Sequence, residues 1–381
     1  MREASDRKTS GADPKSWFAP FLPATAESEA ALFAAIRRQF GGETAAALRR
    51  AMERRRAGTD AAFYAALPPA VRTALALAYD GESLLAMAGF LAAHRELLAG
   101  RVLDFGCGCG LLTLAVGRMA RPRALWGADR DPGALAAART VCGRGGAAAQ
   151  FAREAPAEDF DAVISARTLH ENFDQSGVPY LETLPEAGRR LADRMTGHAR
   201  ALTARVAAEG ALLSVERGGT GPVLLGWLLA LADCGFAPVD YAPLAVRECG
   251  RPASFQALVL RRGAADAETA LVYFCRLAAP AEPAGSLTGM AAAAYLHLWS
   301  GACAYRFAVC SPDGAPMGRG GVWRHKTDGR VLAFQATPAG TALQVLPPEA
   351  LSAAEQQLRA SARQAEAAGY CVQVLSPLCG T

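Results

Sequence analysis

The sequence lacks both a long apolar segment and an export signal. Its longest apolar run, Pro222–Ala232, is shorter than the ~20 residues that a helix needs to cross a bilayer. The first residues, Met1–Lys8, are polar and charged, whereas a secretory signal peptide carries an apolar core. We therefore expect a cytoplasmic protein that does not bind to a membrane.

The cysteines and histidines show no metal-binding pattern. None of the 10 cysteines forms a C-x-x-C motif, and none of the 5 histidines completes the spacing of a zinc site. Unpaired thiols are the default in a reducing cytoplasm. The sequence thus predicts free cysteines and no bound metal.

The chain also lacks a large net charge. With 40 basic and 36 acidic residues the net charge is +4, and nucleic-acid-binding proteins usually concentrate a larger basic excess. One stretch is locally richer and contains Arg37, Arg38, Arg49, Arg50, Arg54, Arg55 and Arg56. The solvated face of an alanine-rich helical segment is the favoured explanation. A surface for RNA or an acidic ligand is the alternative, so nucleic acid is not favoured as a partner.

The composition indicates a folded chain of several domains. Hydrophobic residues make up 51% and charged residues 20% of the 381 residues, which suits two or three globular domains. The patterns predict a flexible N-terminus over residues 1–24, a helical lid region over 25–97, a strand–helix domain over 98–263 and a smaller α+β domain over 285–381. Within the helical region, Asp80–Ser83 predicts a break.

Residues 98–263 alternate between short strands and helices. The expected strands are 101–105, 124–128, 147–153, 161–165, 211–215, 237–241 and 255–260. Helices are expected from Leu111 to Met119 and after Asp131, which caps a helix that begins with Pro132. Such alternation predicts an α/β fold with a doubly wound, mostly parallel, seven-stranded sheet, closed by an antiparallel pair of strands.

The segment Val102–Gly110 is the most informative in the chain. It reads VLDFGCGCG, so a buried strand enters a glycine-rich turn in which the main chain can come close to a ligand. The small Cys107 and Cys109 fit this turn as spacers. Asp104 precedes the first glycine and would repel the pyrophosphate that dinucleotide enzymes hold there. We therefore expect a neutral or cationic ligand and disfavour an NAD-dependent dehydrogenase.

This D-x-G-x-G-x-G loop resembles the first motif of class I (Rossmann-like) S-adenosylmethionine-dependent methyltransferases. Two further stretches agree with that family over residues 80–262, namely Asp129 at the end of the second strand and the strand 160–165. The resemblance implies S-adenosylmethionine as cofactor. It assigns the methionyl end to Asp104, the ribose hydroxyls to Asp129 and the adenine side to Arg130. The implied cofactor-binding residues are Asp104, Gly106, Cys107, Gly108, Gly110, Asp129, Arg130 and Ser165.

His170 and Glu171 are the candidate catalytic residues, because they follow the fourth strand, where the methyl group would be transferred. His170 could act as a general base that Glu171 orients. Equally, His170 could cap the following helix while transfer proceeds by proximity alone. Both interpretations stay open.

The sequence favours an enzyme that methylates a small molecule or a peptide-like biosynthetic intermediate. An RNA or protein methyltransferase is the first alternative, and a non-catalytic, methyltransferase-like partner protein is the second. No Asn/Asp-Pro-Pro-Tyr/Phe tetrad follows the fourth strand, which disfavours the amino-methyltransferases of DNA bases. A second copy of the chain is a candidate partner.

Overall fold

The structure is a computed structural model. It describes residues 26–56, 67–169, 184–218, 222–263 and 302–375 except 325–328 and 338–339, together with a few residues between 265 and 274. The chain forms two compact units. The first comprises residues 1–172, 200–219 and 238–262, and the second comprises residues 173–199, 220–237 and 263–381.

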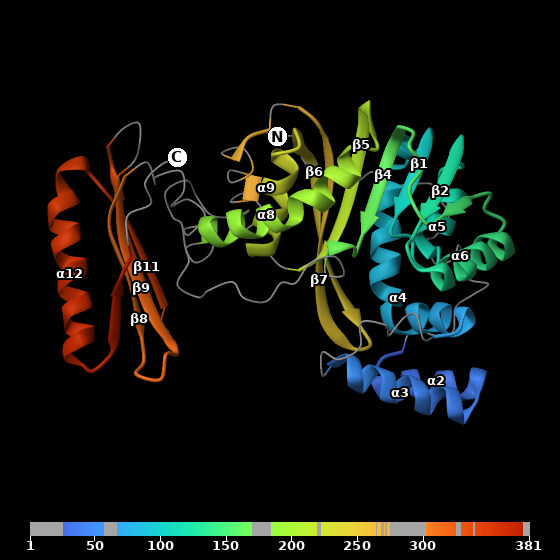
Figure 1. The fold of residues 1–381 in the computed structure, drawn as a ribbon, viewed down its shortest axis with the longest axis horizontal. Helices are drawn as coiled ribbons and strands as arrows, with labels where there is room; N and C mark the ends of the chain where they lie inside the picture. The colour runs from blue at the N-terminus through green and yellow to red at the C-terminus, as the bar shows by residue number, and fades with distance from the viewer. Residues whose placement is uncertain are drawn as a thin grey trace. The chain divides into compact units, whose positions relative to one another are not determined.

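The first unit is built on a seven-stranded sheet with the order β3-β2-β1-β4-β5-β7-β6 (Figure 1). The strands are β1 (Arg101–Phe105), β2 (Ala124–Ala128), β3 (Gln150–Ala152), β4 (Phe160–Ala166), β5 (Val206–Arg217), β6 (Phe236–Glu248) and β7 (Arg251–Arg262). Strands β1 to β5 pair in parallel, and β7 pairs with β5 in antiparallel fashion. The chain winds outward from β1 in both directions, which confirms the predicted fold class.

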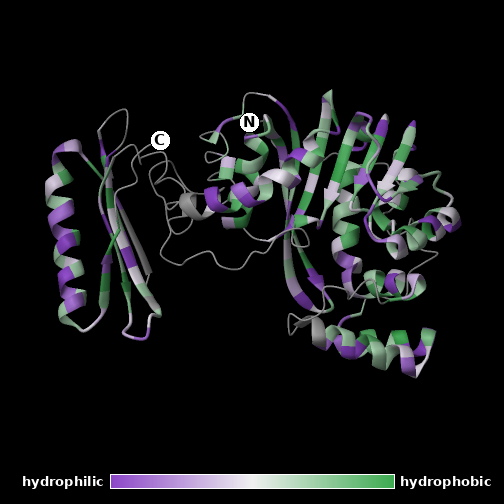
Figure 2. Ribbon diagram, in the orientation of Figure 1, coloured by the Kyte–Doolittle hydropathy of each residue, from purple (hydrophilic) through white to green (hydrophobic). Residues whose placement is uncertain are grey.

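Helices α4 (Pro69–Ala93), α5 (Leu111–Met119) and α6 (Pro132–Gly145) pack on the sheet and on one another. Val102, Ile164 and Leu213 of the strands share a buried core with Leu91 of α4 and Leu114 of α5. Figure 2 shows that these parallel strands are predominantly hydrophobic, as strands buried in a sheet of this kind are. A short 3-10 helix, η1 (Arg95–Leu98), leads from α4 into β1.

Helix α4 is continuous, and the predicted break at Asp80–Ser83 is wrong. Gly81 and Ser83 are buried in the helix. The Ser83 hydroxyl donates to the backbone oxygen of Asp80 at 2.9 Å and to the carboxylate of Glu248 at 3.1 Å. Burial and the Ser83–Glu248 bond override the low helix propensity of Asp80, Gly81 and Ser83.

By length and composition, α4 is also apolar enough to cross a membrane. More than half of its most apolar window, 56%, is nevertheless buried inside the protein. A core helix passes the same test, so this property is weak evidence for a membrane segment.

Two further helices, α2 (Glu29–Phe40) and α3 (Gly42–Arg56), form a second core with α4. Leu32 and Ile36 of α2 meet Leu48 of α3 and Leu75 of α4 in it. The side chains of Arg37, Arg38, Arg49 and Arg50 are exposed. Exposure suits both the solvated-face interpretation and the alternative of a ligand surface.

The second unit contains α8 (Leu184–Thr203) up to residue 199, α9 (Pro222–Ala232) and a five-stranded antiparallel sheet. The sheet has the order β11-β10-β9-β8-β12, and its strands are β8 (Ala302–Cys310), β9 (Pro316–Arg324), β10 (Val331–Thr337), β11 (Gly340–Leu346) and β12 (Cys371–Val374). After the 3-10 helix η2 (Pro348–Ala350), α12 (Leu351–Ala367) packs on this sheet, with Leu358 in a core with Tyr305 and Phe307. This arrangement confirms the predicted C-terminal α+β element.

Candidate functional site

The glycine loop lies between the carboxyl end of β1 and the start of α5. The backbone N–H groups of Gly106 and Cys107 donate to the carbonyl oxygen of Ala128, at 2.8 and 3.0 Å. Gly106, Gly108 and Gly110 have φ angles of +73°, +52° and +77°, values that side chains with a Cβ rarely adopt. The loop is thus fixed against the end of β2 in a conformation that only glycine adopts readily.

The three glycines have different surroundings. A Cβ on Gly106 would lie 2.7 Å from Cγ2 of Thr168, and a Cβ on Gly110 would lie 2.7 Å from Cβ of Ala138. Gly106 and Gly110 therefore allow close packing inside the protein. A Cβ on Gly108 would meet no atom within 4 Å. Gly108 is the point at which the loop backbone faces open space.

Asp104 lies beneath this loop and is buried. Its carboxylate accepts a hydrogen bond of 2.5 Å from the hydroxyl of Thr113 in α5. Burial raises the pKa of Asp104 to about 6, against the opposing effect of the Thr113 bond, and the charge of Asp129 raises this pKa further. Asp104 thus ties the end of β1 to α5 and exchanges its proton close to neutral pH.

Asp129 stands at the carboxyl end of β2 and joins the loop to the next helix. One carboxylate oxygen accepts from the backbone N–H of Gly108 at 2.9 Å, and the other accepts from the N–H of Asp131 at 2.9 Å. Each oxygen can accept a further hydrogen bond. Asp131 caps α6 through the N–H of Gly133, and Pro132 begins the helix, which confirms the predicted helix start. Arg130, beside Asp129, is exposed.

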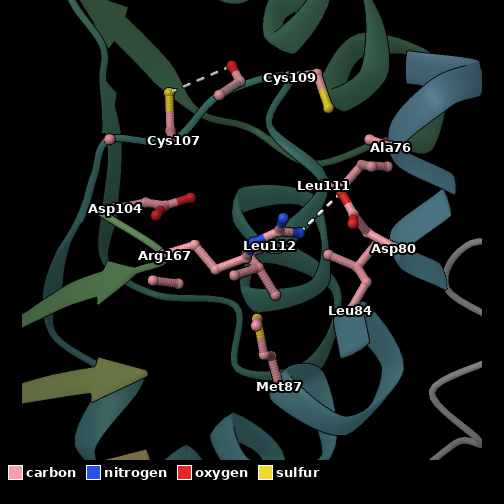
Figure 3. A pocket seen from close by; sticks show the side chains of 13 residues that line it. Ala76, Asp80, Leu84, Met87, Asp104, Cys107, Cys109, Leu111, Leu112 and Arg167 are labelled. Atoms are coloured by element: carbon pink, nitrogen blue, oxygen red, sulfur yellow. Dashed lines mark hydrogen bonds and ion pairs between the residues drawn. The ribbon is translucent and has the colours of Figure 1, made fainter. Parts of the chain in front are cut away.

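A cavity of about 140 Å³ opens in front of the loop. The loop residues Asp104, Gly106, Cys107, Gly108 and Cys109 form one wall, and α4 contributes a second wall with Ala76, Asp80, Leu84 and Met87. The remaining lining comes from Leu111 and Leu112 of α5 and from Ala166 and Arg167 at the end of β4. Figure 3 shows Asp80 and Arg167 joined by an ion pair at one side of this cavity.

The thiols of the glycine loop are poor nucleophiles. Burial raises the pKa of Cys109 to about 12, and burial together with the charges of Asp104 and Asp129 raises the pKa of Cys107 as well. Both thiols therefore stay protonated at neutral pH. This agrees with their interpretation as spacers. Among the residues that the structure describes, no group of three or more His, Cys, Asp and Glu side chains could hold a metal ion.

The segment after β4 is held by a buried acid, Glu216 of β5. Its carboxylate accepts hydrogen bonds from the hydroxyls of Ser165 (3.1 Å) and Thr168 (3.2 Å) and from the backbone N–H of Leu169 (3.1 Å). Burial raises the pKa of Glu216 to about 8, although these bonds oppose the shift. Because Thr168 also packs on Gly106, the segment after β4 and the glycine loop share one packed structure.

The structure brings most of the predicted cofactor residues together. Asp104, Gly106, Cys107 and Gly108 line the cavity, and Asp129 is bonded to the same loop. Ser165 is fully buried and bonds to Thr168 and Glu216, so its cofactor role stays a prediction, as does that of Arg130. The candidate catalytic residues, His170 and Glu171, lie outside the described residues.

Sequence reasoning missed three residues of this region. Asp80 sits on α4 in a stretch that reads as a helix break, and Arg167 and Glu216 lie at the ends of β4 and β5. A signal was present for the latter two, because charged residues at the carboxyl ends of parallel strands lie where such sheets bind ligands. Nothing in the sequence pattern points to Asp80.

Comparison with known proteins agrees with the site. Residues 102–192 match the model of a family described as a methyltransferase domain. No curated protein matches the chain.

Several solved structures share part of the fold. N-methyltransferase NodS from Bradyrhizobium japonicum WM9 is 15% identical, with 46% of this chain and 96% of that chain covered and a TM-score of 0.33. Magnesium protoporphyrin IX methyltransferase (ChlM) from Synechocystis PCC 6803 with bound SAM is 15% identical, with coverages of 48% and 78% and a TM-score of 0.33. A SAM-dependent methyltransferase from Thiobacillus denitrificans, in complex with S-adenosyl-L-homocysteine, is 13% identical, with coverages of 46% and 90% and a TM-score of 0.34.

Three features of the chain together identify its strand–helix domain. The family match begins in β1 and includes the glycine loop and Asp129. The sheet has the doubly wound order, with the antiparallel strand β7 between β5 and the edge strand β6. An acid, Asp104, lies where a pyrophosphate site would need a neutral or basic group. The chain therefore carries a class I, S-adenosylmethionine-dependent methyltransferase domain.

Proposed function

We propose that this protein transfers a methyl group from S-adenosylmethionine to a small-molecule or peptide-like biosynthetic acceptor. One observation carries the proposal: Asp129 and the open side of Gly108 meet at the carboxyl ends of β1 and β2, beside a cavity that contains Asp104. Ligands of open α/β sheets bind at this edge. Two acids close together there suit a ligand that is positively charged and carries hydroxyl groups.

The residues present fit such a cofactor. Asp129 keeps one acceptor site on each carboxylate oxygen after bonding to Gly108 and Asp131, and these sites suit the two hydroxyl groups of a ribose. Gly108 lets the backbone approach the ligand. Asp104 supports the loop from below and adds negative charge at the cavity wall. Arg130 would flank the adenine. Bound S-adenosylmethionine supplies a methyl group on a positively charged sulfur.

For its part, the chain must align the acceptor and exclude water. Alignment alone can lower a barrier by as much as ~7–11 kcal/mol. Glu216 fixes the end of β4 through Ser165 and the segment after it through Thr168 and Leu169. His170 follows this anchored segment directly in the sequence and is the candidate base for a hydroxyl acceptor, with Glu171 as its orienting partner. A base of this kind contributes about 10²–10⁴-fold in rate.

The cavity wall favours a small acceptor over a polymer. Leu84 and Met87 of α4 give it apolar surface on the side opposite the glycine loop, and such surface suits the body of a small organic molecule. The alternatives are an RNA or protein methyltransferase, which would use the exposed arginines of α2 and α3, and a partner protein without catalysis. A cytoplasmic location is part of the proposal.

Calorimetric titration with S-adenosylhomocysteine tests the cofactor site. Asp129→Ala removes two charge-assisted acceptor sites for the ligand, each worth about 1.5–3 kcal/mol. We expect the Kd to rise by about 10² or more. Asp159→Ala, which removes an exposed acid in the loop before β4, should bind like the wild type. If the folded wild type bound no S-adenosylhomocysteine, the partner-protein alternative would replace the enzyme.

Transfer of a labelled methyl group distinguishes the acceptor classes. Under the proposal, label enters a small-molecule or peptide fraction, and raising the salt concentration changes little. Labelling of RNA that falls steeply with salt would instead support the RNA alternative, because phosphate contacts release counterions.

A further inference from the structure

A network of four charged side chains borders the cavity. Arg167, which follows β4, lies 2.8 Å from the carboxylate of Asp80 in α4 and 3.9 Å from the carboxylate of Glu248 in β6. Arg217, at the end of β5, pairs with Glu248. Of the four, Asp80 and Arg167 line the cavity itself, and Figure 3 shows their ion pair. All four residues of the network belong to the first unit.

The backbone of Arg167 is strained. Its φ angle is +60°, in the left-handed region where a residue with a Cβ costs about 1–2 kcal/mol. A hydrogen bond of 2.8 Å from the Arg167 N–H to the carbonyl oxygen of Val215 holds it there. Strain of this size clusters at functional sites. Arg167 is such a case, because its side chain lines the cavity.

Asp80 contributes a buried oxygen atom that accepts no hydrogen bond from the residues that the structure describes. One of its carboxylate oxygens pairs with Arg167. The other, Oδ1, is buried and has no hydrogen-bond partner among the described residues. Leaving a buried acceptor unsatisfied costs about 1–3 kcal/mol, a cost that a ligand with N–H donors would remove. Asp104, the other acid of the cavity, already accepts from Thr113.

The charges of the network limit the kind of ligand that suits it. Two acids, Asp80 and Glu248, balance two bases, Arg167 and Arg217. A lone anion or cation would leave an uncompensated charge in a largely buried place, which is unfavourable. A group with one positive and one negative end can insert between Asp80 and Arg167 and keep the balance. The α-amino and α-carboxylate groups of an amino acid form such a group.

We propose that the Asp80–Arg167 pair recognises the amino-acid end of the cofactor. The carboxylate of Asp80 accepts from the α-ammonium group, and the guanidinium of Arg167 binds the α-carboxylate in its forked geometry. This inference rests on the proposed function, because it requires the cofactor to bind at the glycine loop. It makes the N-terminal helix α4 part of the cofactor site.

Two ligands that differ only at the amino-acid end test this assignment. S-adenosylhomocysteine carries the end, and 5′-methylthioadenosine has the same nucleoside and sulfur without it. Calorimetric Kd values for both are measured with the wild type, Asp80→Asn and Arg167→Gln. We expect the wild type to prefer S-adenosylhomocysteine. Each variant should lose about tenfold or more in affinity for S-adenosylhomocysteine and less than about twofold for 5′-methylthioadenosine.

Glu53→Gln is the control, because Glu53 is an exposed acid of α3 that does not line the cavity, and it should leave both affinities unchanged. The two test substitutions are in different parts of the fold, so the test still works if one of the two variants fails to fold. Equal losses for both ligands, or no loss for either, would overturn the assignment. A wild type that binds neither ligand would contradict the proposed function itself, a separate outcome.

Discussion

The glycine loop makes a prediction in which two similar substitutions have opposite consequences. Gly108 and Gly110 both have left-handed backbones, so alanine at either position costs roughly 1–2 kcal/mol of stability. The two substitutions differ in what the added methyl group contacts. At position 108 it meets no atom within 4 Å, whereas at position 110 it lies 2.7 Å from Cβ and 2.8 Å from Cα of Ala138.

The Ala138 contact involves backbone, which cannot turn away as a long side chain can. Helix α6 would have to shift, and overpacking of this kind costs about 1–3 kcal/mol more. We therefore expect Gly110→Ala to lose roughly 2–5 kcal/mol of unfolding free energy and Gly108→Ala only about 1–2 kcal/mol. For S-adenosylhomocysteine, Gly108→Ala should weaken binding by about tenfold or more, since the methyl group occupies the open side of the loop.

Urea denaturation and calorimetric titration measure the two quantities on the same samples. Gly143→Ala is a suitable control, because Gly143 lies in α6 with an ordinary φ angle and no neighbouring atom within 4 Å. It should gain about 0.5–1 kcal/mol. The reasoning would be refuted if Gly108→Ala kept the wild-type affinity, or if Gly110→Ala were as stable as Gly108→Ala.

Two further predictions concern buried charges. The pKa of Glu216 rises from its ordinary 4.5 to about 8 on folding, so the folded protein keeps a proton that the unfolded chain releases. The unfolding free energy should therefore fall as the pH rises through this window. In urea titrations, Glu216→Gln should make the unfolding free energy fall less steeply between pH 6 and 8. Asp104, with its pKa of about 6, contributes little in this window. If the variant showed the same slope of unfolding free energy against pH as the wild type, the prediction would be contradicted. Arg72 pairs with Asp131 and donates to the carbonyl oxygen of Leu67. The substitution Arg72→Met should therefore lower the unfolding free energy by about 1–3 kcal/mol. Arg123→Met, which breaks an exposed pair with Asp161, should stay within about 0.5 kcal/mol, and equal losses for the two variants would speak against the buried role of Arg72.

The centre of the fold could be read from the sequence because its signals are strong and local. A short apolar strand, a glycine turn and an apolar helix follow one another from Arg101 to Met119, and the structure has β1 and α5 with the expected bounds. The same holds for β2, whose end at Ala128 is marked by the acid that follows it. Asp104 and the loop glycines were found for the same reason.

Boundaries set by distant contacts could not be read in this way. Helix α8 ends at Thr203, and β5, which was expected to start at residue 211, already begins at Val206. The guanidinium of Arg262 donates to the carbonyl oxygens of both residues, at 3.1 Å. Strands β6 and β7 are also longer than expected, because backbone pairing continues through polar residues such as Asp240 and Arg247, where hydropathy gives no signal.

The charged pair at the cavity was missed because it joins two segments that are far apart in the chain. Asp80 reads as a helix breaker beside Gly81, and the place of Arg167 directly after β4 does not indicate its partner. Only the packing of α4 on the sheet brings the two side chains to 2.8 Å. Helix propensity and hydrophobic spacing describe neighbours in sequence, so neither could reveal this pair.

The continuity of α4 has a consequence for how this enzyme can be divided. The family match begins at residue 102, yet Met87, Phe90 and Leu91 of α4 complete the core beneath β1 and β4. Arg72 of the same helix binds the residue that caps α6. A shortened protein that began at β1 would expose this core and lose one wall of the cavity. We therefore expect the smallest piece able to fold and bind a ligand to include α4, beyond the region shared with the family.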